Sequence, residues 1–122
     1  MKGSLTMKIG SIAELLGANV IYGNNMLDCE VNSACGCDMM SDVLAFVKDQ
    51  AVLLTGLCNP QVVRTADMMD MRCIVFVRGK KPSEDIVSLA EEAGIAVLTT
   101  DLRMYTACGL LYSNGLAGGN LA

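Results

Sequence analysis

Residues 73–100 read CIVFVRGKKPSEDIVSLAEEAGIAVLTT and contain two apolar runs with an amphipathic segment between them. The runs, at 73–77 and 95–99, do not alternate apolar with polar residues, which is typical of strands buried on both faces of a parallel sheet. The segment between them repeats apolar residues at the spacing of one helical face, at Ile86, Leu89, Ala90 and Ala93. Gly94 follows, and glycine commonly ends helices. The stretch therefore predicts a strand, a helix and a second strand in one parallel sheet.

The same pattern continues on both sides of this stretch. Upstream, AVLLT at 51–55 predicts another buried strand, and a helix should begin after Asn59, a good helix cap, with Pro60 in its first turn. Downstream, Thr100 is predicted to cap a last helix that ends near Gly115. The buried stripe of that helix is predicted to be Leu102, Tyr105, Cys108 and Tyr112.

The first fifty residues are less regular. The segment IGSIAELLG predicts a helix that ends at Gly17, with a buried side made of Ile9, Ile12, Ala13 and Leu16. Strands are expected near 18–22 and 29–35, and a further helix from about Asp38. Alternating strands and helices are typical of an α/β domain.

The chain has 122 residues, of which 52% are hydrophobic, and this is enough for one domain with one core. We expect a single three-layer α/β domain with a largely parallel sheet flanked by helices, spanning residues 8–115. Residues 1–7 are expected to be a flexible leader and residues 116–122 a flexible tail.

Composition narrows the classes of partner. A net charge of −4 argues against nucleic acid, because neutralising phosphates needs a basic face. No apolar stretch approaches the roughly 18 residues of a membrane-spanning helix, and the N-terminus does not resemble a secretory signal. Six cysteines in so apolar a chain indicate reduced thiols rather than a disulfide scaffold. We expect a cytoplasmic protein without nucleic-acid or membrane partners.

A ligand site is expected beyond the carboxyl ends of the parallel strands, where the loops TGLCN (55–59), RGKKP (78–82) and TTD (99–101) come together. Three of the nine basic residues gather in the second loop beside a predicted helix start, which favours a phosphate or carboxylate. Ordinary surface lysines in a solvated turn are the alternative. The predicted ligand-binding residues are Thr55, Gly56, Asn59, Arg78, Gly79, Lys80, Lys81, Thr99, Thr100 and Asp101.

The motif Cys35-Gly36-Cys37 raises the question of a metal or redox site. With no histidine in the chain, a four-ligand metal site would need other cysteines. Cys73 lies in a predicted buried strand and Cys108 on a predicted apolar stripe. Residues two apart on a strand are about 6.6 Å from each other, which is awkward for a disulfide. Packing is the favoured role, and no metal or cofactor is expected.

Catalytic motifs are missing from the sequence. Asp38 and Asp42 are assigned to the first turn of one helix, where carboxylates favour the helix dipole. The chain contains no histidine, no GxSxG motif and no phosphate-binding GxxxxGK[ST] loop. We therefore expect a protein that is not an enzyme. The methionines at 38–40 and 66–71 are either core filler or an adaptable surface for self-association, and a homodimer is expected.

Residues 73–107 resemble the DRTGG domain and the related N-terminal domain of HPr kinase/phosphorylase. Arg78, Gly79 and Pro82 match the Arg-Gly-x-x-Pro turn of the kinase domain, and the likeness covers most of residues 8–112. Asn59-Pro60 stands in place of the Asp-Arg pair that opens the family name. Val-Arg-Gly replaces its Thr-Gly-Gly.

The resemblance implies a compact α/β domain of a kind found beside CBS modules, phosphotransacetylases and HPr kinases. It implies a regulatory or ligand-sensing role and no kinase activity, because the kinase's phosphate-binding loop belongs to a separate domain. The function expected from residues and resemblance together is a stand-alone sensor of an anionic small molecule, a nucleotide or phosphorylated metabolite. The alternatives are an adaptor that docks on a larger partner enzyme and a cysteine-based metal or redox protein.

Overall fold

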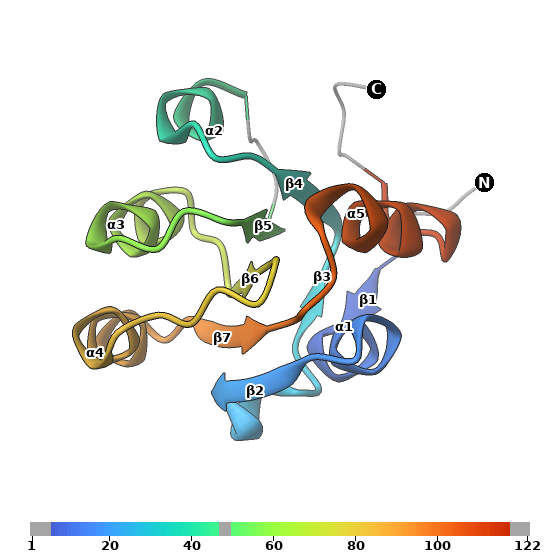
Figure 1. Ribbon diagram of the computed structural model, residues 1–122, viewed down its shortest axis with the longest axis horizontal. Coiled ribbons are helices and arrows are strands. Elements are labelled where there is room, and N and C mark those ends of the chain that lie inside the picture. Colours follow the sequence, from blue (N-terminus) through green and yellow to red (C-terminus); the bar gives the residue numbers. More distant parts are fainter. Residues whose placement is uncertain (1–5, 47–49, 118–122) are drawn as a thin grey trace.

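The computed structural model describes residues 6–46 and 50–117. Its elements alternate between strands and helices along most of the chain (Figure 1). In chain order they are β1 (Met7–Lys8), α1 (Ile9–Leu16), β2 (Asn19–Tyr22), a 3₁₀ helix (Asn24–Met26), β3 (Glu30–Val31), β4 (Ser33–Gly36), α2 (Met40–Phe46), β5 (Ala51–Thr55), α3 (Pro60–Met68), β6 (Cys73–Phe76), α4 (Glu84–Ala93), β7 (Ala96–Thr99) and α5 (Met104–Ser113).

The main sheet has five strands in the order β2-β7-β6-β5-β4. Strands β4 to β7 are mutually parallel, and β2 pairs antiparallel with β7. Helices α2, α3 and α4 cover one face, while α1 and α5 cover the other (Figure 1). The predicted three-layer α/β fold with a largely parallel sheet is therefore confirmed. A separate two-stranded ribbon joins β1 to β3.

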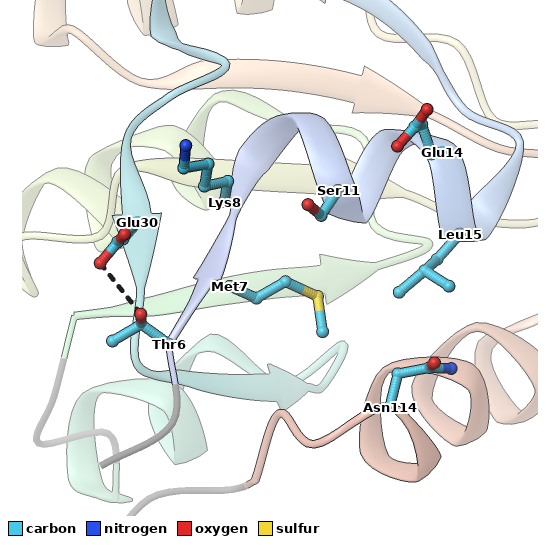
Figure 2. Close-up of a pocket in the computed structure, with 8 residues that line it drawn as sticks. All are labelled: Thr6, Met7, Lys8, Ser11, Glu14, Leu15, Glu30 and Asn114. Carbon is cyan, nitrogen blue, oxygen red and sulfur yellow. Dashed lines mark hydrogen bonds between the residues drawn. The ribbon is translucent and has the colours of Figure 1, made fainter. Parts of the chain in front are cut away.

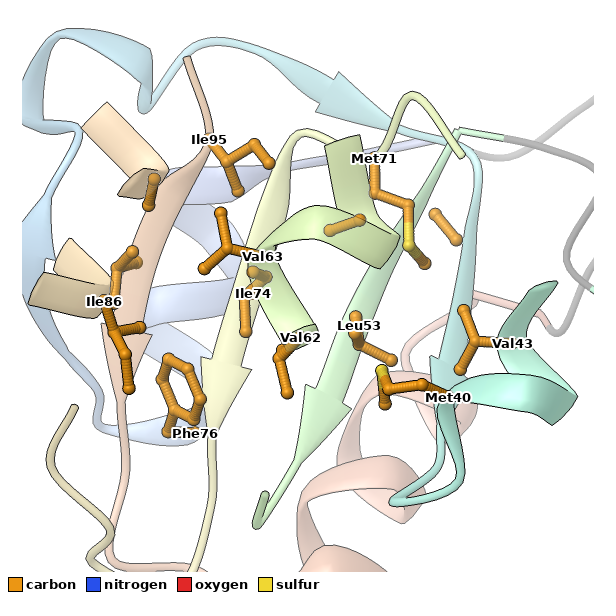
Figure 3. Close-up of a cluster of buried hydrophobic side chains, with 14 residues drawn as sticks. Met40, Val43, Leu53, Val62, Val63, Met71, Ile74, Phe76, Ile86 and Ile95 are labelled. Carbon is orange, nitrogen blue, oxygen red and sulfur yellow. The ribbon is translucent and has the colours of Figure 1, made fainter. Parts of the chain in front are cut away.

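The central strands form because their side chains are apolar on both faces of the sheet. Every residue of β5, β6 and β7 is buried, and successive side chains point to opposite faces of the sheet. Leu53 thus packs under α2 and α3 together with Ile74 and Phe76 (Figure 3), whereas Leu54 packs against the other helical layer. The core is therefore two apolar layers divided by one sheet.

The predicted signals at helix ends are confirmed at α3 and α4. The side chain of Asn59 accepts a hydrogen bond from the Val62 amide at 3.3 Å, as an N-cap does. Gly94 ends α4 with a left-handed φ of 74°. On α4, Ile86 and Ala90 are buried, as the apolar spacing predicted.

The last helix differs from its prediction. Arg103, not Thr100, is the N-cap of α5. The hydroxyl of Thr100 instead donates to the Leu16 carbonyl at 2.7 Å and accepts from the Leu102 amide at 3.2 Å, so the helix begins later. This start directs Ala107 and Leu111 into the core, while Tyr105 is 89% exposed and Tyr112 is 73% exposed. The predicted buried stripe was therefore wrong for both tyrosines.

The region before β5 also differs from its prediction. The strand expected at 29–35 is divided between β3, in the small ribbon, and β4, at the edge of the main sheet. The predicted helix begins at Met40 rather than at Asp38. Asp38 therefore lies in the loop between β4 and α2.

The ordered chain reaches further than predicted at both ends. Met7, assigned to a leader, pairs with Val31 in the small ribbon. Leu116, assigned to a tail, is 2% exposed, and the carbonyl of Ala117 accepts a hydrogen bond from the Ala34 amide at 2.9 Å. Residues 1–5 and 118–122 of the predicted leader and tail lie outside the described residues.

Gly23 allows a close approach between β2 and β7. Its φ is 108°, and a Cβ at this position would lie 2.8 Å from the Cβ and 3.0 Å from the Cα of Ala96. We predict that Gly23→Ala lowers the free energy of unfolding by about 2–3 kcal/mol, because it adds backbone strain and a clash. The measurement is urea denaturation of the two proteins.

Gly17→Ala is the matched control for this prediction. Gly17 also has a positive φ, of 57°, but nothing lies within 4 Å of its Cβ position. Gly17→Ala should lower the free energy of unfolding by about 1–2 kcal/mol, because it adds only backbone strain. An equal or larger loss for Gly17→Ala would contradict the role assigned to the contact with Ala96.

Candidate functional site

The parallel strands β4 to β7 end at the same side of the sheet, and we call the loops that follow them the carboxyl edge. These loops are 37–39, 56–59, 77–83 and 100–103. Main-chain hydrogen bonds hold the last two loops together: the Arg78 amide donates to the Leu102 carbonyl at 2.7 Å, and the Gly79 amide donates to the Thr100 carbonyl at 2.9 Å. The basic loop thus has a fixed place on the sheet.

The basic loop begins with a tight turn. The Lys80 amide donates to the Val77 carbonyl at 3.2 Å, and both residues between them have positive φ, 61° at Arg78 and 70° at Gly79. This is the pattern of a type I′ turn, whose first central position prefers asparagine, aspartate or glycine. An arginine there holds a left-handed conformation that costs roughly 1–2 kcal/mol.

The turn directs the Arg78 side chain across the end of the neighbouring strand β5. A Cβ at Gly56 would overlap the Arg78 Nη2 atom and would lie 2.8 Å from Cζ and 3.0 Å from Nε. Only a glycine at position 56 lets the guanidinium lie there undisturbed. Across residues 6–46 and 50–117, the guanidinium donates no hydrogen bond to another side chain or carbonyl and forms no ion pair within 4.0 Å. Within this part of the chain, the guanidinium donors have no protein partner.

Asp38 is a site residue that the sequence analysis missed. Its Oδ1 accepts hydrogen bonds from the Thr55 hydroxyl and the Gly56 amide, both at 2.8 Å. The bond from the Gly56 amide, with smaller effects of the Thr55 hydroxyl and the Arg78 charge, holds the pKa of the Asp38 carboxyl below its ordinary value of 3.8 against the effect of burial. The carboxylate therefore ties the loop after β4 to the end of β5, beside Arg78.

The predicted site residues fall on two sides of the 77–80 turn. Thr55 and Gly56 lie on the Arg78 side. Burial raises the pKa of the Cys58 thiol there, and the charge of Lys80 opposes this rise. On the other side, a small hollow of about 110 Å³ lies beside the start of β2. It is lined by Gly17, Asn19, Gly79, Lys81, Thr99, Thr100 and Asp101.

Several predicted polar groups are already used by the fold. The Thr55 hydroxyl donates to Asp38 and accepts from the Leu57 amide, and the Thr100 hydroxyl is likewise paired on both sides. The Asn59 side chain caps α3. The first turn of α4 carries Glu84 and Asp85, whose carboxylates already favour its dipole. The basic side chains at this edge, those of Arg78, Lys80 and Lys81, are all exposed.

Neither of two hollows near α1 suits a large anion. The 110 Å³ hollow has room for about three or four waters, at roughly 30 Å³ each. A hollow of about 620 Å³ lies between α1, the β1–β3 ribbon and the end of α5 (Figure 2), and its lining includes Glu14, Glu30 and one cation, Lys8. Lys8 also lies 3.8 Å from the Asp28 carboxylate. The residues that line the 620 Å³ hollow have a net negative charge, which opposes the binding of an anion.

The cysteines of the CGC motif pack against the core. Cys35 and Cys37 lie on the face covered by α2 and α3, while Cys108 packs on the opposite face of β4. Burial, with the nearby Cys37 and Cys108, raises the pKa of Cys35 to about 11, so its thiol is protonated at neutral pH and a poor nucleophile. Among the described residues, no group of three or more Cys, Asp or Glu side chains is arranged to hold a metal ion.

We predict that Asp38→Asn lowers the free energy of unfolding at pH 7 by about 1 kcal/mol, because it weakens two hydrogen bonds of an exposed carboxylate. Since the folded pKa of Asp38 is depressed, its ionised form stabilises the fold above about pH 4, and this contribution is lost as the pH falls further. Denaturation at pH 7 and pH 3 measures this difference. A difference between wild type and variant that grows at pH 3 would contradict the assignment.

One protein family and one solved structure are similar to most of this chain. The model of the DRTGG domain family matches residues 11–113. Among solved structures, the fold is similar to the crystal structure of the CBS and DRTGG domains of the regulatory region of Clostridium perfringens pyrophosphatase, complexed with its activator, diadenosine tetraphosphate. The TM-score is 0.71 at 19% identity. The match covers 91% of this chain and 50% of that chain, so this chain spans half the length of that structure. No curated protein matches.

Proposed function

Because the chain belongs to the DRTGG domain family, we propose that it is a regulatory domain that binds an anionic small molecule, a nucleotide or phosphorylated metabolite, at its carboxyl edge. The observation that carries the proposal is the Arg78 guanidinium, which lies across Gly56 with its donors unpaired among the described residues. A guanidinium offers five donors in a planar fork and can hold a phosphate through two parallel hydrogen bonds.

The conformation of Arg78 supports this role. A left-handed arginine costs free energy that asparagine or glycine would not, and such strain is typical of functional sites. Lys80 and Lys81 follow in the same loop and add positive charge for a polyanion. The ligand would lie on the surface of the edge against Arg78 and Lys80, and Lys81 would add its charge from the other side of the turn.

The comparison supports the regulatory class of this proposal. The similar pyrophosphatase region is regulatory and was crystallised with a nucleotide activator. The likeness of Arg78, Gly79 and Pro82 to the turn in the N-terminal domain of HPr kinase/phosphorylase adds to the same class. The proposed role is non-catalytic and cytoplasmic. None of the described helices is long and apolar enough to span a membrane.

Thermal unfolding of the full chain tests the proposal, with ATP, diadenosine tetraphosphate and acetyl phosphate as probes. A ligand at a hundred times its dissociation constant stabilises by about 2.7 kcal/mol, which raises Tm by roughly 8–15 °C in a domain of this size. The shift should disappear in the double variant Lys80→Glu, Lys81→Glu. It should persist in Arg64→Glu, Arg72→Glu, which changes the charge equally at exposed positions on α3 and before β6.

Two results would contradict the proposal. One is the absence of any shift with all three probes. The other is a shift of equal size in both double variants, since the binding would then not depend on the basic loop.

The variant Asp38→Asn should bind the anion about fivefold more tightly than wild type, because it removes a negative charge near Arg78.

Docking on a partner enzyme is the second candidate function. It is favoured by two methionines that the sequence left open between core and surface: Met39 is 60% exposed and Met68 is 73% exposed. Exposed methionines suit adaptable protein contacts. This candidate predicts a partner-dependent rise in Tm and no response to any anion.

A further inference from the structure

Helix α5 presents an uncharged face with two exposed aromatic side chains. Tyr105 is 89% exposed and Tyr112 is 73% exposed, and Gly109 lies exposed between them on the same side of the helix. The helix itself forms a shallow hollow of about 550 Å³ along this face. Its lining residues are Tyr105, Thr106, Cys108, Gly109, Leu110, Tyr112 and Ser113.

No contact among the described residues requires a glycine at position 109. Within that part of the chain, nothing outside its own helix backbone lies within 4 Å of the position that a Cβ would take, and the residue sits inside a helix, where glycine costs about 1 kcal/mol relative to alanine. A glycine between two large side chains leaves a gap on the helix surface. Such a gap is useful where another backbone or a large side chain comes close.

We propose that α5 packs antiparallel against α5 of a second copy of this chain, in a symmetric dimer. A two-fold axis beside Gly109 brings Tyr105 of each copy next to Tyr112 of the other, because the two positions lie on either side of that axis at nearly equal spacing. The two glycines then face each other and let the helices approach closely. In the antiparallel arrangement, the positive N-terminal end of each helix dipole also lies beside the negative C-terminal end of the other.

Charge favours a second copy over an unlike partner. The chain carries a net charge of −4, so two copies that met through most surfaces would repel each other. From Met104 to Ser113 no residue is charged. A symmetric contact through this face brings no like charges together, and the face offers no carboxylate to the basic residues of another protein.

The area is sufficient for the core of an interface. Aromatic side chains bury about 150–250 Å² each, so the four tyrosines of a symmetric dimer contribute about 600–1,000 Å². Specific interfaces start at about 1,200 Å² in total. The hollow and the flanking Thr106 and Ser113 supply the remaining contact.

Sedimentation equilibrium of the full chain tests the proposal. At about 100 µM, well above a micromolar dissociation constant, the wild type should sediment at twice the 12.9 kDa of one chain. Tyr105→Glu should raise the dissociation constant about 100-fold or more, since each dimer loses two buried tyrosines. The matched control Met68→Glu adds the same charge at an exposed position on α3 and should leave the dimer intact.

A second variant separates the interface from general charge effects. Gly109→Gln adds an uncharged, helix-favouring side chain in open space, so the monomer should keep or raise its Tm. Its dimer should weaken about tenfold, because the gap is filled. A wild type that is monomeric at about 100 µM, or a dimer unaffected by Tyr105→Glu, would overturn the proposal. A dimer that both glutamate variants weaken equally would also overturn it.

Discussion

Replacement of Arg78 by asparagine should remove most of the proposed anion binding and leave the fold intact. The affinity for a phosphate-bearing probe should fall at least about 100-fold, because two charge-assisted hydrogen bonds of roughly 1.5–3 kcal/mol each are lost. Asparagine tolerates the left-handed conformation that Arg78 adopts with φ 61°. The free energy of unfolding should therefore stay within about 1 kcal/mol of wild type, or rise. Calorimetric titration with ATP and urea denaturation measure the two quantities.

Gly56→Ala tests the same site without changing any charge. The new methyl group would occupy the place of the Arg78 guanidinium and displace it, while the Gly56 amide could still donate to Asp38. Since Gly56 is not among the residues with positive φ, alanine fits the backbone. We expect the affinity to fall about tenfold. Unchanged affinity in both Arg78→Asn and Gly56→Ala would remove Arg78 from the site.

Phe76→Ala should cause the largest loss of stability, about 3–5 kcal/mol. Phe76 is fully buried at the end of β6, in the layer beneath α3 and α4 (Figure 3). Its removal loses the transfer free energy of the ring and leaves a cavity. A domain of this kind is stable by only about 5–15 kcal/mol, so a large part of the total would be lost. Urea denaturation measures this loss of stability, and the m-value should stay unchanged.

Ile21→Ala is the matched control for the core prediction. Ile21 lies on β2 and is 47% exposed, so about half of its apolar surface is already in water. The expected loss is below about 1.5 kcal/mol. A loss in Phe76→Ala no larger than that in Ile21→Ala would contradict the assignment of Phe76 to the centre of the core.

The sequence predicted the central strands because their signal is local. Continuous apolar runs such as 51–55 require cover on both faces, and only a sheet between two helical layers supplies it. Asn59 and Gly94 also act within a few residues of their own positions. These features needed no knowledge of distant contacts.

The features that were missed depend on residues far apart in the chain. Asp38 bonds to Gly56, eighteen positions later, and no periodicity marks such a pair. The one signal available was a carboxylate directly after an expected strand. The start of α5 is similarly set by the bond from Thr100 to Leu16. The prediction placed Tyr105 and Tyr112 on the buried side of the helix because aromatic residues are more often buried than exposed.

The sequence predicted which loops form the candidate site but not how their side chains are arranged. The rule that loops at the carboxyl ends of parallel strands come together led to the basic loop. The sequence did not reveal that the 77–80 turn separates Arg78 and Gly56 from Lys81 and Thr99. The left-handed conformation of Arg78 was also unpredictable, since arginine is not a favoured residue at that position of a type I′ turn.

Amide chemical shifts of the ¹⁵N-labelled full chain, followed during titration with ATP, test the central claim most directly. The account predicts saturable shifts that are largest at Gly56, Arg78, Gly79 and Lys80, and that vanish in Arg78→Asn. Shifts that are largest around α1 and the β1–β3 ribbon would place the ligand elsewhere. An absence of saturable shifts would contradict an anion site at the carboxyl edge.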